Sequence, residues 1–262
     1  MNTSKRNYLS IVSLVLIVLL VSTVMLVNSR KDSSVISSDN SKQTIDLVFK
    51  PVEIEPLKEV EITDEFKYVD TIELKCFNGS LHVYAKNDET ESGEVYGFIE
   101  HNNKFYEVNV ISAYGVEDQN INLVDVTKDG RNELQLIGSL GSTYAELKII
   151  SYDANDEQWI NLLTMGTPYI VDLDGDGVNE YIGVSTGSMP GFVDIYRWNG
   201  EFFVKASVTE STNNIYANLY NNQVTSEHKS IQDGSWIIET GNNDKSEFYR
   251  YELGKLVKTI QN

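Results

Sequence analysis

A run of nine residues near the middle of the chain has acidic side chains with the spacing of a calcium-binding loop. Asp172, Asp174, Asp176 and Glu180 stand at positions 1, 3, 5 and 9 of this run, with glycines at positions 4 and 6. This spacing turns the carboxylates toward one centre, and glycine allows the positive φ of a tight turn. Carboxylates so close together repel one another unless a cation is present, and oxygen donors without His or Cys favour calcium over zinc or copper. The predicted calcium ligands are Asp172, Asp174, Asp176, the carbonyl of Val178, and Glu180.

A degraded version of the same run lies 47 residues earlier. Thr127 replaces the second aspartate, and Lys128 and Arg131 add two positive charges. The aligned positions, which form a weaker candidate for a second metal site, are Asp125, Thr127, Asp129, Arg131 and Glu133. A structural turn and a metal site both remain open for this loop.

Two other interpretations compete for the loop at Asp172. An EF-hand requires a bidentate Glu at position 12, but that position is Gly183, and strands rather than helices are expected on both sides. A solvated Asp/Gly turn without a metal is the simpler alternative.

The elements that must hold these loops are expected to be strands. From Ile45 onward, apolar residues alternate in short stretches such as Leu147–Ile150 and Phe192–Tyr196, with Asn, Asp and Gly between them. No segment of 45–262 sustains a helical apolar stripe over three turns. The sequence therefore predicts an all-β domain over 45–262.

Aromatic hairpins recur along this domain, at Phe98–Tyr106, Tyr196–Phe203 and Tyr249–Val257. Together with the two acidic loops, they divide the chain into four units of about 47–50 residues, a period typical of four-stranded propeller blades. The predicted units are 65–113, 114–165, 166–212 and 213–261. We expect a β-propeller-like repeat domain, and ring closure is left open.

The loop Asp172–Glu180 and the aromatic strand after it, Tyr196–Phe202, resemble the FG-GAP/VCBS repeat family, whose units carry an Asp-x-Asp-x-Asp-Gly-x-x-Asp/Glu calcium loop. Asp125–Glu133 matches this pattern partly, and the resemblance covers about 119–208. It implies a calcium-bound β-propeller that serves in adhesion or recognition on cell surfaces or secreted proteins. Family members often have seven blades, whereas this chain has room for about four.

The N-terminus carries a membrane signal. Residues 1–31 contain four basic and no acidic side chains, and Ile11–Val27 is almost entirely Ile, Val, Leu and Met. This run suffices to cross a bilayer as a helix, although a cleaved signal peptide is the alternative. We expect a transmembrane signal-anchor at 1–31, a flexible tether at 32–44, and an extracytoplasmic domain, which would be secreted if the signal is cleaved.

The composition of the chain argues against some classes of function. A net charge of −18 argues against nucleic-acid binding, and a single Cys excludes an intramolecular disulfide framework. No arrangement of His, Ser or paired acids indicates catalysis, so we assign no catalytic residue. The predicted function is a cell-surface binding module for a protein or glycan; the alternative is an extracellular polysaccharide hydrolase or lyase on the same scaffold.

Two further features bear on partners. Trp159, Trp198 and Trp236 recur at similar spacing, which suits either packing between units or stacking on a sugar or peptide. A third, separate hypothesis is an assembly role in which the segment 45–64 pairs with a strand edge of another chain.

Overall fold

The computed structural model describes residues 43–86, 93–185, 187, 190–221, 236–242 and 245–259. These residues belong to one compact unit, Lys42–Asn262. The predicted anchor and all but the end of the predicted tether lie outside the described residues. In the described ranges, no helix is long and apolar enough to cross a bilayer.

Four antiparallel sheets make up the described residues, which confirms the all-β prediction. Each sheet contains four consecutive strands that pair in sequence order. The first unit contains β5 (Phe66–Leu74), β6 (Gly79–Lys86), β7 (Val95–His101) and β8 (Lys104–Ser112). The second contains β9 (Gln119–Val124), β10 (Glu133–Gly141), β11 (Tyr144–Asp153) and β12 (Gln158–Gly166). The third contains β13 (Pro168–Val171), β14 (Glu180–Val184), β15 (Val193–Trp198) and β16 (Phe203–Ser207). The fourth contains β17 (Tyr216–Asn221), β18 (Trp236–Asn242), β19 (Lys245–Glu252) and β20 (Lys255–Lys258).

Short helices occur at two places in the described chain. The 3-10 helix η1 (Lys75–Phe77) joins β5 to β6, and α2 (Val208–Thr212) joins the third unit to the fourth. The four sheets correspond to the four units expected from the sequence repeats.

Tight turns connect the last two strands of these units where the sequence predicts hairpins. Asn102 and Asn103 both adopt positive φ between β7 and β8, Gly200 does so between β15 and β16, and Leu253 and Gly254 do so between β19 and β20. Asn and Gly tolerate this conformation better than other residues.

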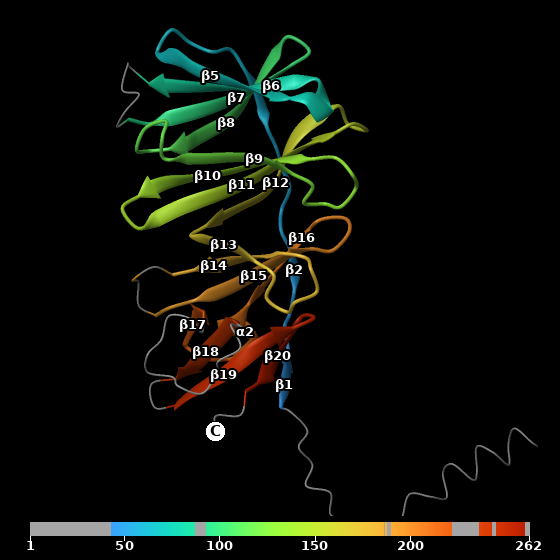
Figure 1. The fold of residues 1–262 in the computed structure, drawn as a ribbon, viewed down its shortest axis with the longest axis vertical. Helices are drawn as coiled ribbons and strands as arrows, with labels where there is room; N and C mark the ends of the chain where they lie inside the picture. Colours follow the sequence, from blue (N-terminus) through green and yellow to red (C-terminus); the bar gives the residue numbers. More distant parts are fainter. Residues whose placement is uncertain are drawn as a thin grey trace, which may run out of the picture. The chain divides into compact units, whose positions relative to one another are not determined.

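A fifth strand of every sheet comes from one extended segment, residues 44–60, which we name the strap. It contains β1 (Thr44–Asp46), β2 (Lys50–Pro51), β3 (Glu55–Pro56) and β4 (Lys58–Val60). These strands pair with the last strand of the fourth, third, second and first units, respectively. The strap therefore crosses the four sheets in the reverse of their sequence order, along one edge of the stack (Figure 1).

The strap has a repeat of its own. The backbone N–H groups of Leu47, Val52 and Leu57, at intervals of five residues, donate to carbonyls of Gly254, Phe203 and Trp159. These strands pair within their own chain and are the outermost strands of their sheets, so pairing of their other edge with another chain stays a prediction.

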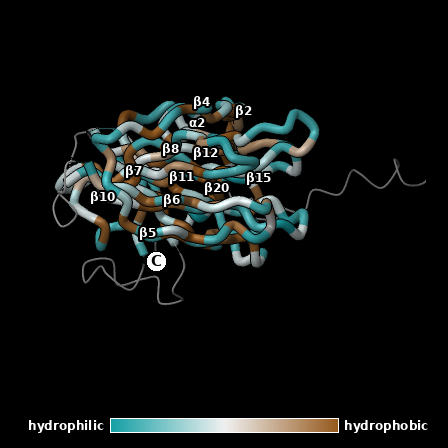
Figure 2. Tube along the Cα trace, turned by 90° about the horizontal axis from the view of Figure 1, so that it is seen from above, coloured by the Kyte–Doolittle hydropathy of each residue, from teal (hydrophilic) through white to brown (hydrophobic). Residues whose placement is uncertain are grey.

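The core lies between successive sheets. One apolar cluster joins the first and second units around Leu81 and Trp159, a second joins the second and third around Ile149 and Phe203, and a third joins the third and fourth around Ile195 and Tyr249. Hydrophobic and hydrophilic residues are interspersed along the strands in Figure 2. In the middle sheets, strands such as β10 and β14 have buried residues on both faces, because a sheet covers each side.

The first and fourth sheets lie at opposite ends of the stack in Figure 1. The described residues thus form an open array of four sheets rather than a closed ring.

Candidate functional site

The acidic loop lies between β13 and β14 and is folded by its first aspartate. Asp172 Oδ1 accepts hydrogen bonds from the N–H groups of Gly175 (2.7 Å) and Asp176 (3.1 Å), and Oδ2 accepts one from Gly177 (2.9 Å). Gly175 and Gly177 adopt φ values of 79° and 85°. One carboxylate thus shapes the turn, and the two glycines supply the conformation that other residues rarely adopt.

Three of the predicted ligands meet in this loop. Asp172, Asp174 and Asp176 each offer a carboxylate oxygen within 4.8 Å of the others. Arg250, from β19, lines the cavity beside Asp174 and Asp176. Three carboxylate oxygens at this separation could hold a metal ion, and oxygen donors suit a hard divalent cation.

The two other predicted ligands lie differently. Glu180 is buried, is not part of the three-carboxylate group, and accepts a hydrogen bond from Leu173 N (2.9 Å). Burial raises the pKa of Glu180 to about 7, and the nearby aspartates act in the same direction. Val178 is exposed, and its N–H donates to Asp176 Oδ1 (2.7 Å).

The earlier loop, between β9 and β10, has nearly the same backbone. Gly130 N donates to Asp125 Oδ2 (3.2 Å), Arg131 N donates to Asp129 Oδ1 (2.8 Å), and Lys128 and Gly130 have φ values of 60° and 86°. Each of these features has a counterpart 47 positions later. The partial sequence match between the loops therefore reflects a shared conformation.

Side chains in the earlier loop neutralise one another. The Arg131 guanidinium donates to Asp129 Oδ2 through Nε (2.9 Å) and Nη2 (2.6 Å), and this contact lowers the pKa of Asp129. Buried Glu133 accepts from Val126 N (2.8 Å), Thr127 N (3.1 Å) and Thr127 Oγ1 (3.1 Å), while burial raises its pKa. The geometry thus favours the structural turn over a second metal site.

The acidic loop of the third unit also forms a hydrogen bond with the fourth unit. Asp174 Oδ2 accepts a hydrogen bond from Leu253 N (2.9 Å), in the turn between β19 and β20. The next carbonyl, of Gly254, accepts from Leu47 N (3.1 Å) in the strap. A cation at Asp174 would therefore sit at a junction of three segments distant in sequence.

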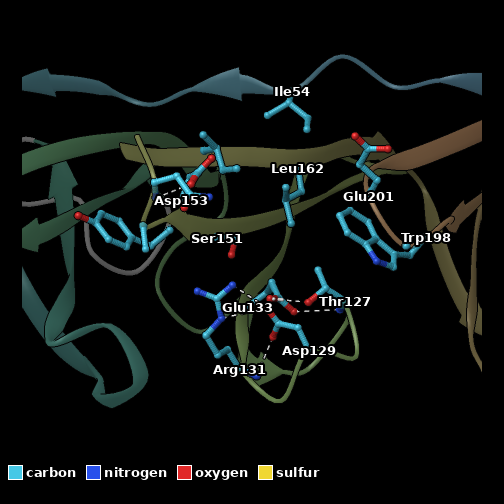
Figure 3. A pocket seen from close by; sticks show the side chains of 15 residues that line it. Ile54, Thr127, Asp129, Arg131, Glu133, Ser151, Asp153, Leu162, Trp198 and Glu201 are labelled. Carbon is cyan, nitrogen blue, oxygen red and sulfur yellow. Dashed lines mark hydrogen bonds and ion pairs between the residues drawn. The ribbon is translucent and has the colours of Figure 1, made fainter. Parts of the chain in front are cut away.

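A cavity lies beside each loop, where two units meet. Each has a volume of about 440 Å³. The first lies between loop residues such as Arg131 and the β15–β16 turn with Trp198 and Glu201 (Figure 3). The second lies between Asp174 and the β19–β20 turn, with Trp236 in its wall. Patterns within one unit did not predict these cavities, because their walls come from separate units. The period of the repeat was the available signal.

The three tryptophans have different environments. Trp159 is fully buried between the first and second units, while Trp198 and Trp236 are half-buried in the walls of the two cavities. All three pack on the apolar clusters between units, and Trp198 and Trp236 are in addition placed where a ligand could reach them.

The two described histidines, His82 and His101, have their contacts outside the acidic loops. His82 Nδ1 lies 2.9 Å from Thr71 Oγ1, and His82 Nε2 lies 2.8 Å from Glu100 Oε2, in a polar chain across three strands of the first sheet. His101 stacks on Tyr152 at a centroid distance of 4.6 Å. His228 lies outside the described residues.

Comparisons with known proteins identify no family, so the function is argued from the geometry of the site. No protein-family model, no curated protein and no solved structure matches the chain.

Proposed function

We propose that this chain is a calcium-stabilised β-repeat module that recognises a protein or glycan outside the cytoplasm. The observation that carries the proposal is the group of three carboxylates at Asp172, Asp174 and Asp176, whose oxygens lie within 4.8 Å of one another. The resemblance of their loop to the FG-GAP/VCBS calcium loop supports the same ion, and the four sheets would be propeller-type blades in an open array.

The role of calcium in this proposal is structural. Asp174 would bind the ion while it also accepts the hydrogen bond from Leu253, so the ion would fix the third unit against the fourth. At about 1 mM calcium and a dissociation constant of about 0.1 mM, typical of extracellular modules, binding adds about 1.4 kcal/mol to the free energy of unfolding. That amount is enough to order a loop and its neighbouring turn.

The location follows from the N-terminal sequence. The apolar run in residues 1–31 would anchor the module in a membrane, or export it if the run is cleaved. Extracellular fluids supply calcium at the concentration that a loop of this kind needs. An array of four sheets offers a long surface, and repeat proteins commonly use such surfaces to bind partners.

Calcium-dependent melting tests the proposal. The wild-type melting temperature should rise by a few degrees between excess EDTA and about 1 mM calcium. Asp172→Asn or Asp176→Asn should remove most of this rise, whereas Asp129→Asn in the earlier loop should retain it. A wild-type melting curve that does not respond to calcium would refute calcium stabilisation.

The alternative, a polysaccharide hydrolase or lyase, requires a carboxylate pair or a histidine beside a deep pocket. Neither His82 nor His101 lines the cavities beside the two loops. Asp153 and Glu201 both line the first cavity, so this alternative predicts cleavage of a sugar there, whereas recognition predicts binding without cleavage.

A further inference from the structure

The cavity between the second and third units has one aromatic wall. Trp198 ends β15, and its indole is held edge-on by Phe203 at a centroid distance of 5.4 Å. Leu162 and the exposed Ile54 of the strap extend this apolar side. In Figure 3, the indole lies on one side of the cavity with the carboxylate of Glu201 above it.

The opposite wall is polar. Ser151 and Asp153, from the end of β11, lie across the cavity from Trp198, and Arg131 lies below them (Figure 3). Asp153 Oδ1 accepts a hydrogen bond from Asn155 N (2.8 Å), which fixes the carboxylate at the start of its turn. The wall therefore presents both acceptors and donors in fixed positions.

Charge limits the class of ligand. Asp129 is paired with Arg131, and Glu133 is bound by its own loop, so these groups are already satisfied. Asp153 and Glu201 remain, and two carboxylates disfavour an anionic ligand. The Arg131–Asp129 pair is neutral and does not repel a cation, so a Lys-rich peptide is included in the test below. A neutral ligand with many hydroxyl groups can donate to the carboxylates and accept from Arg131.

We propose that the cavity between the loop at Arg131 and the turn at Glu201 binds a neutral pyranose sugar, with one C–H face of the ring stacked on Trp198. A cavity of about 440 Å³ is within the range of small-molecule sites, which combine an apolar surface with a few placed polar groups. This inference rests on the proposed recognition function and names its ligand class and its site.

The second cavity provides an internal contrast. It has the same volume and also contains a tryptophan, Trp236, but two carboxylates of the acidic loop, Asp174 and Asp176, and Arg250 of β19 line it. Trp236 is therefore a matched control for Trp198.

Sugar titrations of the full chain test the inference, in calcium buffer and in a detergent without a sugar headgroup. The probes are the methyl glycosides of glucose, galactose, mannose and N-acetylglucosamine and their β-linked disaccharides, followed by saturation-transfer NMR and calorimetry. We expect at least one probe to bind with a dissociation constant on the order of 1 mM. Trp198→Ala should weaken binding at least tenfold, Trp198→Phe less, and Trp236→Phe should leave it unchanged.

Glu201→Gln is a second test in case Trp198→Ala disturbs folding, because Glu201 is exposed. The Glu201→Gln variant should bind the sugar several-fold more weakly at an unchanged melting temperature. The inference is overturned if no probe binds, if binding survives Trp198→Ala in a folded protein, or if a Lys-rich peptide displaces the sugar and binds more tightly. Calcium-dependent melting of the same samples separates the two proposals: loss of sugar binding alone contradicts the sugar site, and loss of the calcium response alone contradicts the stabilising ion.

Discussion

The loops Asp125–Glu133 and Asp172–Glu180 are built on one backbone but balance their charge in different ways. In both, the first Asp accepts a hydrogen bond from the Gly five residues later, and the final Glu is buried and accepts from the N–H of the second loop residue. The conformation of the turn therefore does not depend on the side chain at positions 3, 4 or 7.

The difference lies in the source of the positive charge. In the earlier loop, Arg131 supplies it from within the chain by binding Asp129. In the later loop, the uncharged Val178 stands at the aligned position. The earlier loop thus carries its own cation for Asp129, although Asp125 Oδ1 is buried without a hydrogen-bond partner. The later loop is expected to bind an ion from solution. The experiments below test this contrast.

The largest effect is expected from removal of the buried glutamates. Glu133→Ala leaves the N–H groups of Val126 and Thr127 without their carboxylate, whereas Glu180→Ala affects Leu173. Glu133→Ala removes three hydrogen bonds, although Val126 N keeps its bond to Val124 O, and Glu180→Ala removes the bond from Leu173. Because each such bond contributes about 1 kcal/mol, Glu133→Ala should lower the free energy of unfolding by about 3 kcal/mol and Glu180→Ala by about 1 kcal/mol. Urea unfolding in EDTA measures both. Equal losses would mean that the glutamates contribute alike in the two loops.

A graft should convert the earlier loop into the later one. Thr127→Asp, Lys128→Gly and Arg131→Val together recreate the acidic spacing without the internal cation. The triple variant should gain a second calcium-dependent increment of about 1.4 kcal/mol at about 1 mM calcium, in addition to the wild-type increment. Lys128→Gly alone is the control and should not change the calcium dependence. A calcium response no larger than that of wild type would show that the aspartates are insufficient.

The smallest effect is expected from the Arg131–Asp129 pair in acid. Arg131 holds the pKa of Asp129 below its ordinary value of 3.8, so the unfolded chain binds this proton more readily. The stabilisation is therefore complete above about pH 4 and is lost as the pH falls through the folded-state pKa. It should be below about 1 kcal/mol, because both groups are partly exposed. A carbon-13 NMR titration of Asp129 in wild type and Arg131→Gln checks it; an unchanged pKa in the variant would contradict the pairing.

Local patterns predicted the repeated sheets because the hairpins are formed by residues close in sequence. The turns at Asn102–Asn103, Asn199–Gly200 and Gly254 combine positive-φ residues with flanking alternation, and both signals are visible in the chain itself. The strap was not predicted, because its strands are two or three residues long, contain Pro51 and Pro56, and pair with residues far along the chain. The five-residue interval between Pro51-Val52 and Pro56-Leu57 was the signal that could have revealed it.

One part of the candidate site could likewise be predicted from local sequence, and the other part could not. The spacing of Asp172, Asp174 and Asp176 predicted that they would meet, since they share one loop. The contact of Asp174 with Leu253, and the cavity between Arg131 and Trp198, depend on how one unit packs on the next. No periodicity within a unit contains that information.

The strap also dictates the order in which the domain can be completed as it is synthesised. Its last strand, β4, finds its partner β8 early, whereas its first strand, β1, must wait for β20 near the end of the chain. Pairings between residues distant in sequence form slowly, because a long loop must close first. A nascent chain should therefore close its sheets from the first unit to the fourth, and the fourth should be the last to become resistant to proteolysis.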